Sequence, residues 1–117
     1  MQLSQALPDI EFDEYGFLRD PRQWDRSVAE RIARVLGVGP LGEEHWAVID
    51  FVRDRWLEHG AIEANQVACA HHKLEDHCVW RLFGGPLELW RIAGLPWPGS
   101  EAFTYMENEE PPEAVNA

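Results

Sequence analysis

The chain has 117 residues, of which 45% are hydrophobic, so it can form one domain with a hydrophobic core, and it holds no run of the ~20 apolar residues that a membrane span needs. Its formal net charge of −11 gathers at the two ends: residues 1–14 carry four acids, residues 101–117 carry five, and neither segment has a base. A polyanion would be repelled by these ends and would find no cluster of Lys and Arg elsewhere, so we do not expect nucleic acid as a partner.

The first half of the chain predicts a hairpin and two helices. Residues 10–18 alternate apolar and polar side chains around a turn, which predicts a short β-hairpin in which Gly16 takes a positive φ. Apolar residues at helical spacing predict a helix over residues 22–36. A broad apolar stripe over residues 43–59 predicts a central helix, with two glutamates in its first turn and Gly60 at its end.

The second half predicts shorter helices and a tail. Residues 63–83 form either one helix or two helices separated by a break near Glu75. A hinge follows, and a last helix begins at Pro86 and ends at Gly94. Beyond residue 98 the composition is polar and has little to bury. The predicted organisation is a flexible N-terminus at residues 1–8, one domain at residues 9–98 and an acidic, disordered tail at residues 99–117.

Three stretches, in this order, carry a family resemblance. The first is Phe-Asp-Glu-Tyr-Gly-Phe-Leu at residues 12–18, and the second is Glu-Glu-His-Trp-Ala-Val-Ile-Asp-Phe-Val-Arg-Asp at residues 43–54. The third runs from Leu-Phe-Gly-Gly-Pro at residues 82–86 to Arg-Ile-Ala-Gly-Leu-Pro at residues 91–96. With these stretches the chain resembles the DsrC/TusE/DsvC sulfur-relay family. The resemblance implies a mostly α fold: a small orthogonal helical bundle with an N-terminal β-hairpin, a helix-turn-helix-like part and a flexible C-terminal tail.

The resemblance also implies a site that this chain does not keep. In the family a flexible C-terminal arm carries a penultimate cysteine that takes part in sulfur transfer, with dissimilatory sulfite reductase or in tRNA thiolation. Some members have a second cysteine just before the Ile-Ala-Gly-Leu-Pro stretch. Here these positions fall close to Glu101 and on Trp90, and neither side chain can accept a persulfide as a thiolate does. We therefore expect no catalytic residue at either position.

Cys69 and Cys78 are the only cysteines, too few for a disulfide framework. On one continuous helix nine residues place two side chains about 180° apart, so the pair could not form a disulfide, although a break near Glu75 would remove that objection. We interpret one or both as free, buried, apolar side chains. A sulfur-carrying role for either thiol stays as the alternative.

The same segment contains metal-ligand types. Cys69, His72, His77 and Cys78 form a set that zinc accepts, and the first two have the spacing that shares a helix face. The usual Cys-x₂-Cys spacing is absent, so a polar helix end with exposed histidines is the preferred interpretation, and we predict no metal or other cofactor. His45, at the start of the central helix, is interpreted as structural.

Aromatic residues lie where the family's arm would leave the body. Trp90 is predicted to pack in the core, whereas the three aromatic residues Trp97, Phe103 and Tyr105 are predicted to contact a protein partner. The leading hypothesis is a non-enzymatic binding or regulatory partner in sulfur metabolism. A sulfur carrier acting through one of the two cysteines is the main alternative, and a helix-turn-helix DNA-binding regulator is the third, which the acidic balance disfavours. With no signal peptide visible, we expect a cytoplasmic protein.

Overall fold

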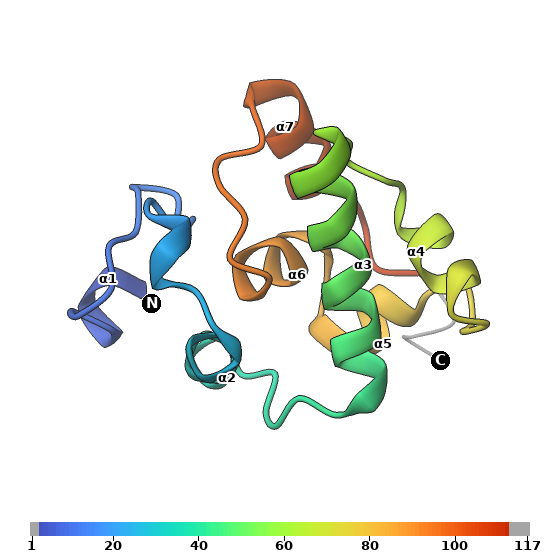
Figure 1. The fold of residues 1–117 in the computed structure, drawn as a ribbon. Coiled ribbons are helices and arrows are strands. Elements are labelled where there is room, and N and C mark those ends of the chain that lie inside the picture. The colour runs from blue at the N-terminus through green and yellow to red at the C-terminus, as the bar shows by residue number, and fades with distance from the viewer. Residues whose placement is uncertain (1–2, 113–117) are drawn as a thin grey trace.

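A computed structural model describes residues 3–112, and within them it contains helices and no β-strand. The elements are α1 (Leu3–Ala6), the 3-10 turn η1 (Pro21–Gln23), α2 (Arg26–Val35), α3 (Glu43–His59), α4 (Asn65–His71), α5 (Cys78–Phe83), α6 (Pro86–Ile92) and α7 (Ser100–Asn108). The long helix α3 packs against α4 and α5, whereas α1, on the far side of the molecule from α3, packs against α2 (Figure 1). No helix among the described residues is long and apolar enough to cross a membrane. The mostly α fold predicted from the sequence is confirmed.

The central helix begins and ends as predicted. At its start the backbone N–H of Gly42 donates to Nδ1 of His45 at 3.0 Å, and at its end Gly60 takes a φ of 64°. Because Nδ1 is the acceptor in this hydrogen bond, Nε2 is the nitrogen that carries the proton, and it lies 3.0 Å from the Leu82 carbonyl oxygen. His45 thus ties the start of α3 to α5, which confirms its structural role.

The helix predicted over residues 22–36 begins later than expected. Asp20 caps the separate turn η1, the chain is extended at Trp24, and α2 starts only after Asp25, whose carboxylate accepts the Val28 N–H at 2.8 Å. The interruption frees the Trp24 indole to donate to the Ile92 carbonyl, 68 residues along the chain, at 3.0 Å. A tertiary hydrogen bond therefore replaces one more turn of helix.

The predicted β-hairpin is wrong in its strands, although its turn is present. Among the described residues it is reduced to one antiparallel bridge between Phe12 and Leu18. The Asp13 carboxylate holds the turn by accepting the backbone N–H groups of Tyr15 and Phe17, each at 2.9 Å. Pairing stops there because the Gln23 side chain, rather than a strand, accepts the next backbone N–H, that of Glu11, at 2.9 Å.

The predicted break between residues 63 and 83 is present, whereas the two ends of the described chain contain helices where the sequence predicts flexible or disordered segments. Residues 63–83 form two helices, α4 and α5, and Gly84-Gly85 separates α5 from α6. The segment predicted to be a disordered tail forms α7, because Phe103 and Met106 pack partly buried against the core. At the other end, where the sequence predicts a flexible N-terminus, α1 buries Leu3. Residues 113–117 of the predicted tail lie outside the described residues.

Candidate functional site

The two cysteines form a disulfide between α4 and α5. Cys69 lies in α4 and Cys78 is the first residue of α5, with 5.8 Å between their Cα atoms, and both are 0% exposed. The chain reverses between them at Lys73, which has a left-handed φ of 59°, and the Leu74 N–H donates back to the Cys69 carbonyl at 2.9 Å. The prediction of free thiols is wrong, because this turn folds α5 onto α4 and brings the sulfurs together. Their predicted burial is confirmed.

The candidate zinc ligands do not form a metal centre here. The disulfide occupies the sulfurs of Cys69 and Cys78, and a disulfide sulfur is not the thiolate that zinc binds. His77 is exposed, while the ring of His72 packs edge-on to Phe51 with 5.9 Å between ring centroids. Within residues 3–112 no three His, Cys, Asp or Glu side chains converge as metal ligands.

Trp90, at the first position where the resemblance would place a thiol, is buried. Its side chain is 3% exposed and packs edge-on against Trp56, with 5.6 Å between ring centroids. Its indole Nε1 donates to the Pro96 carbonyl at 2.7 Å. An indole here both fills the core and fixes the first residues of the segment that follows α6. Glu101, at the second such position, is an exposed residue in the first turn of α7.

The end of α6 is fixed by side chains from elsewhere in the fold. The guanidinium of Arg53 lies 3.7 Å from the centroid of Trp24 and donates to the Ala93 carbonyl at 2.7 Å. Burial lowers the pKa of Arg53 from its usual value. Gly94 takes a φ of 70° beside Trp24, and a Cβ on it would meet that ring at 2.0 Å. The direction in which the chain leaves α6 is therefore set by close packing.

The segment that leaves α6 folds back onto the N-terminal turn. Trp97 stacks on Tyr15 with 4.6 Å between ring centroids, and Phe103 of α7 lies 5.0 Å from Trp97. Arg91 supports this cluster from α6 by donating to the Tyr15 carbonyl at 2.7 Å, and burial lowers the pKa of its guanidinium. Trp97 and Phe103, two of the three predicted partner-binding residues, are thus partly covered by intramolecular packing.

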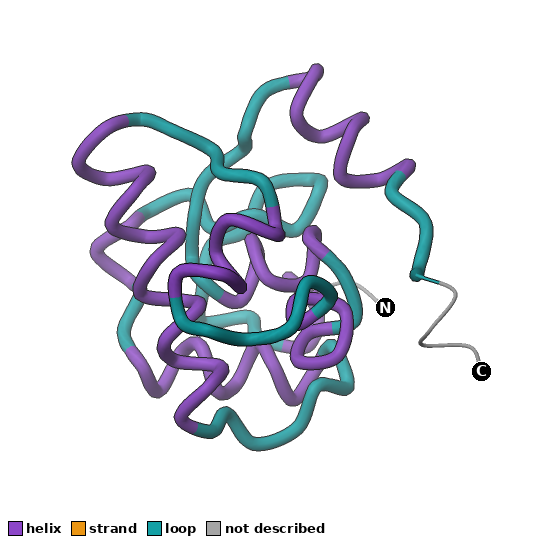
Figure 2. The backbone as a smooth tube through the Cα atoms, turned by 90° about the vertical axis from the view of Figure 1, so that its right-hand side faces the viewer, coloured by secondary structure: helices purple, strands orange, loops and turns teal. Residues whose placement is uncertain are grey.

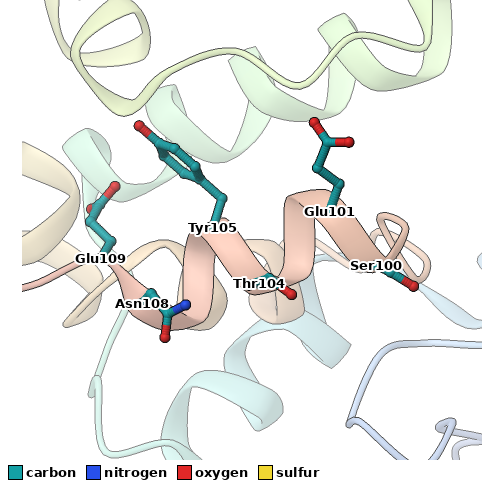
Figure 3. A pocket seen from close by; sticks show the side chains of 6 residues that line it. All are labelled: Ser100, Glu101, Thr104, Tyr105, Asn108 and Glu109. Carbon is teal, nitrogen blue, oxygen red and sulfur yellow. The ribbon is translucent and has the colours of Figure 1, made fainter.

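Tyr105, the third, remains 77% exposed on α7. Figure 3 shows it projecting to the same side of the helix as Glu101 and Glu109. The far end of α7 is attached to the body through Glu109, whose carboxylate accepts the Trp80 indole N–H at 2.7 Å and the Asn65 amide at 2.8 Å. Sequence analysis missed this attachment, because nothing local to Glu109 indicates its two partners.

Comparison with known proteins identifies the fold's relatives. The family model described as DsrC like protein matches residues 6–100 of the chain. The chain belongs to the DsrC-like family. Among its relatives, the protein named Sulfurtransferase TusE of Shigella dysenteriae is 35% identical over 99 residues, which cover 77% of this chain and 90% of the relative. The protein of the same name in Escherichia coli K12 is 34% identical with the same coverage.

Solved structures of DsrC-like proteins have the same fold. The oxidised gamma-subunit of dissimilatory sulfite reductase, DsrC, from Archaeoglobus fulgidus matches with a TM-score of 0.67 and 34% identity, over 78% of this chain and 90% of that one. A structure titled dissimilatory sulfite reductase I matches with a TM-score of 0.69 and 26% identity, over 78% and 89%. The DsrC-like match ends at residue 100, where α7 begins, so the aromatic packing and the Glu109 attachment of α7 lie at or beyond its edge.

Proposed function

We propose that this DsrC-like protein acts in a cytoplasmic sulfur relay as a binding or regulatory partner that does not itself carry sulfur. The supporting observation is that neither cysteine sulfur is accessible to a donor or acceptor protein. Both cysteines are 0% exposed and joined to each other, and residues 95–112, which follow α6, contain none. A carrier needs a thiolate that can meet the donor and the acceptor in turn.

The proposed role keeps the scaffold and assigns recognition to its surface. The two positions that the family resemblance assigns to thiols hold Trp90 and Glu101, of which the first is fixed in the core and the second is a surface acid. The Trp90 indole does structural work instead, holding the Pro96 carbonyl. Such a protein can occupy the place of a sulfur carrier in a complex, or regulate access to it, without transferring an atom.

A second candidate, a sulfur carrier acting through Cys69 or Cys78, is favoured by the similarity to proteins named Sulfurtransferase TusE. It requires a thiol reductant to donate two electrons and two protons to the disulfide. One thiolate would then attack the sulfane sulfur of a donor persulfide, forming a protein persulfide and releasing the donor thiolate. Burial of both sulfurs opposes this step, because the donor must reach an atom without exposed surface.

Intact-mass spectrometry after incubation with glutathione persulfide distinguishes the two candidates. We expect no gain of a sulfur atom on the protein, whether it is first oxidised or first reduced and desalted. The double variant Cys69→Ala with Cys78→Ala serves as the blank for non-specific adducts. A sulfur adduct on the reduced protein that is lost in the double variant and passes to an acceptor thiol would replace the proposed function with the carrier function.

The net charge of −11 disfavours a DNA-binding role. On α5, Arg81 pairs with Glu75 and Glu44, and on α6, Arg91 is turned onto the Tyr15 carbonyl. These two arginines, one on α5 and one on α6, are thus engaged by acceptors of the protein itself.

A further inference from the structure

A surface groove lies between α7 and the chain that enters α4. It has a volume of about 630 Å³. Its lining comes from residues 62–66, from Pro86 at the start of α6, and from residues 98–109. The groove lies where α7 faces the start of α4, and the hydrogen bond from the Asn65 amide to the Glu109 carboxylate joins its two walls. Figure 2 shows α7 at the periphery of the molecule, joined to the other helices by the loop that precedes it.

The groove offers apolar contact to a ligand. Ile62 is 37% exposed at one wall and Tyr105 is 77% exposed at the other, and both are large side chains that gain from burial. Met106 and Pro86 also line the groove. Tyrosine in this position provides a broad, stiff surface with few rotatable bonds, the property that makes it common in protein-binding sites.

Every charged side chain that lines the groove is acidic. They are Glu63, Glu101 and Glu109, and no Lys, Arg or His joins them. Glu109 already accepts two hydrogen bonds from the body, whereas Glu63 and Glu101 form no ion pair with any residue of the part that the structure describes. Elsewhere several acids are paired, as Asp9 is with Arg31 at 2.8 Å. An unpaired acidic rim around an apolar lining favours a cationic, partly apolar ligand.

We propose that this groove binds a Lys- or Arg-bearing segment of a partner protein, which places a large apolar side chain between Ile62 and Tyr105 and its cationic groups near Glu63 and Glu101. A second copy of this chain is disfavoured as the occupant, because each copy carries a net charge of −11. A nucleic acid is repelled for the same reason. This proposal rests on the proposed function in one respect: it names the chemistry of the partner that the chain binds. It does not depend on whether the chain carries sulfur.

The test uses the full-length protein and three synthetic peptides with blocked ends. The first has a central Leu-Phe pair flanked by lysines, the second replaces the lysines by glutamates, and the third keeps the lysines and replaces Leu-Phe by Ser-Ser. Fluorescence anisotropy gives the affinity, and amide chemical shifts of labelled protein give the site. We expect only the first peptide to bind measurably, with shifts confined to residues 62–66 and α7, and the affinity to fall as salt is raised.

Charge reversal in the groove provides the matched comparison. Glu63→Lys with Glu101→Lys should weaken binding of the first peptide about tenfold, the effect of opposing two surface charges. The control reverses two exposed acids away from the groove, Glu11→Lys with Glu43→Lys, and should change the affinity less than about twofold. Both doubles have the same net charge, so a general electrostatic effect would affect them equally. Equal weakening by the two doubles would overturn the proposal.

The apolar half of the proposal has its own test. Tyr105→Ser should weaken binding of the Leu-Phe peptide severalfold with little change in the melting temperature, because Tyr105 is 77% exposed. Binding of the Ser-Ser peptide as tight as that of the Leu-Phe peptide would contradict it. Concentration-dependent dimerisation that shifts the same amides would assign the groove to a second copy instead. Sulfur transfer measured by mass has no bearing on any of these results, so the two proposals can fail separately.

Discussion

The α4–α5 pair and the segment from residue 95 to residue 109 are held in place by different kinds of interaction. A covalent bond between Cys69 and Cys78 closes the first, and both sulfurs are without exposed surface. The second is held by non-covalent contacts: the hydrogen bond from Trp90 to the Pro96 carbonyl, the aromatic contacts around Trp97 and the carboxylate of Glu109. The cysteine sulfurs therefore lie in the part that is closed by a covalent bond, and the segment held by non-covalent contacts contains no thiol. Under the proposed function, this division is what would make the chain a binding partner rather than a sulfur carrier.

The largest effect is expected where the C-terminal segment leaves α6. Gly94→Ala should lower the free energy of unfolding by about 3 kcal/mol or more, because a Cβ would meet Trp24 at 2.0 Å and a φ of 70° disfavours any side chain. Urea denaturation measures the loss. Gly37→Ala is the control, since its φ is also positive, at 79°, but its Cβ would meet nothing within 4 Å. Equal losses in the two variants would mean that packing against Trp24 does not fix this junction.

Reducing the disulfide between Cys69 and Cys78 should have the next largest effect on stability. Reduction opens the loop between two cysteines that are nine residues apart in the sequence. The entropy of closing such a loop corresponds to roughly 2.5 kcal/mol of stability. Urea denaturation with and without a phosphine reductant measures the difference. The double variant Cys69→Ala with Cys78→Ala should not respond to the reductant. A wild-type curve that is also unaffected would show that the α4–α5 turn is held by packing alone.

The attachment of α7 should be weaker and more local. Glu109→Ala removes the acceptor of two hydrogen bonds and leaves the Trp80 indole and the Asn65 amide without it, a change of about 1–2 kcal/mol. The loss should appear as faster amide exchange in α7, with little change in α3. Glu110→Ala, at the neighbouring exposed position, is the control. If exchange quickened across the whole molecule, α7 would be part of the cooperative core and the contrast between the two regions would disappear.

The smallest effect concerns acid stability of the α4–α5 pair. Hydrogen bonding to Arg81 lowers the pKa of Glu75 from 4.5 to about 2. A carboxyl whose folded-state pKa is depressed adds stability above its unfolded pKa and loses it as the pH falls, here between about pH 4.5 and pH 2. Because the pair is largely exposed, the contribution should stay below about 1 kcal/mol. Glu75→Gln should therefore flatten the stability curve in that window and leave it unchanged in shape near neutral pH.

Local patterns in the sequence were sufficient for the long elements. The apolar stripe of α3, the glycine at its end and the break between α4 and α5 all follow from periodicity and turn chemistry, which act over a few residues. Motif order carried the family assignment across residues 9–98. The burial of Trp90 was predictable from its place on an apolar helix face. Each of these depends on neighbours in the chain.

Only the tertiary structure decided where distant groups meet. The Cys69–Cys78 bond depends on the turn at Lys73, and the late start of α2 depends on the bond from Trp24 to the Ile92 carbonyl. The helix α7 exists because Phe103 finds Trp97 and because Glu109 finds α4 and α5. A polar segment has too little apolar surface to order itself, so its state is set by partners that the local sequence does not specify. For that reason the sequence determined the scaffold and the absence of a cysteine from the C-terminal segment. Packing between distant residues decided where the sulfurs of Cys69 and Cys78 lie.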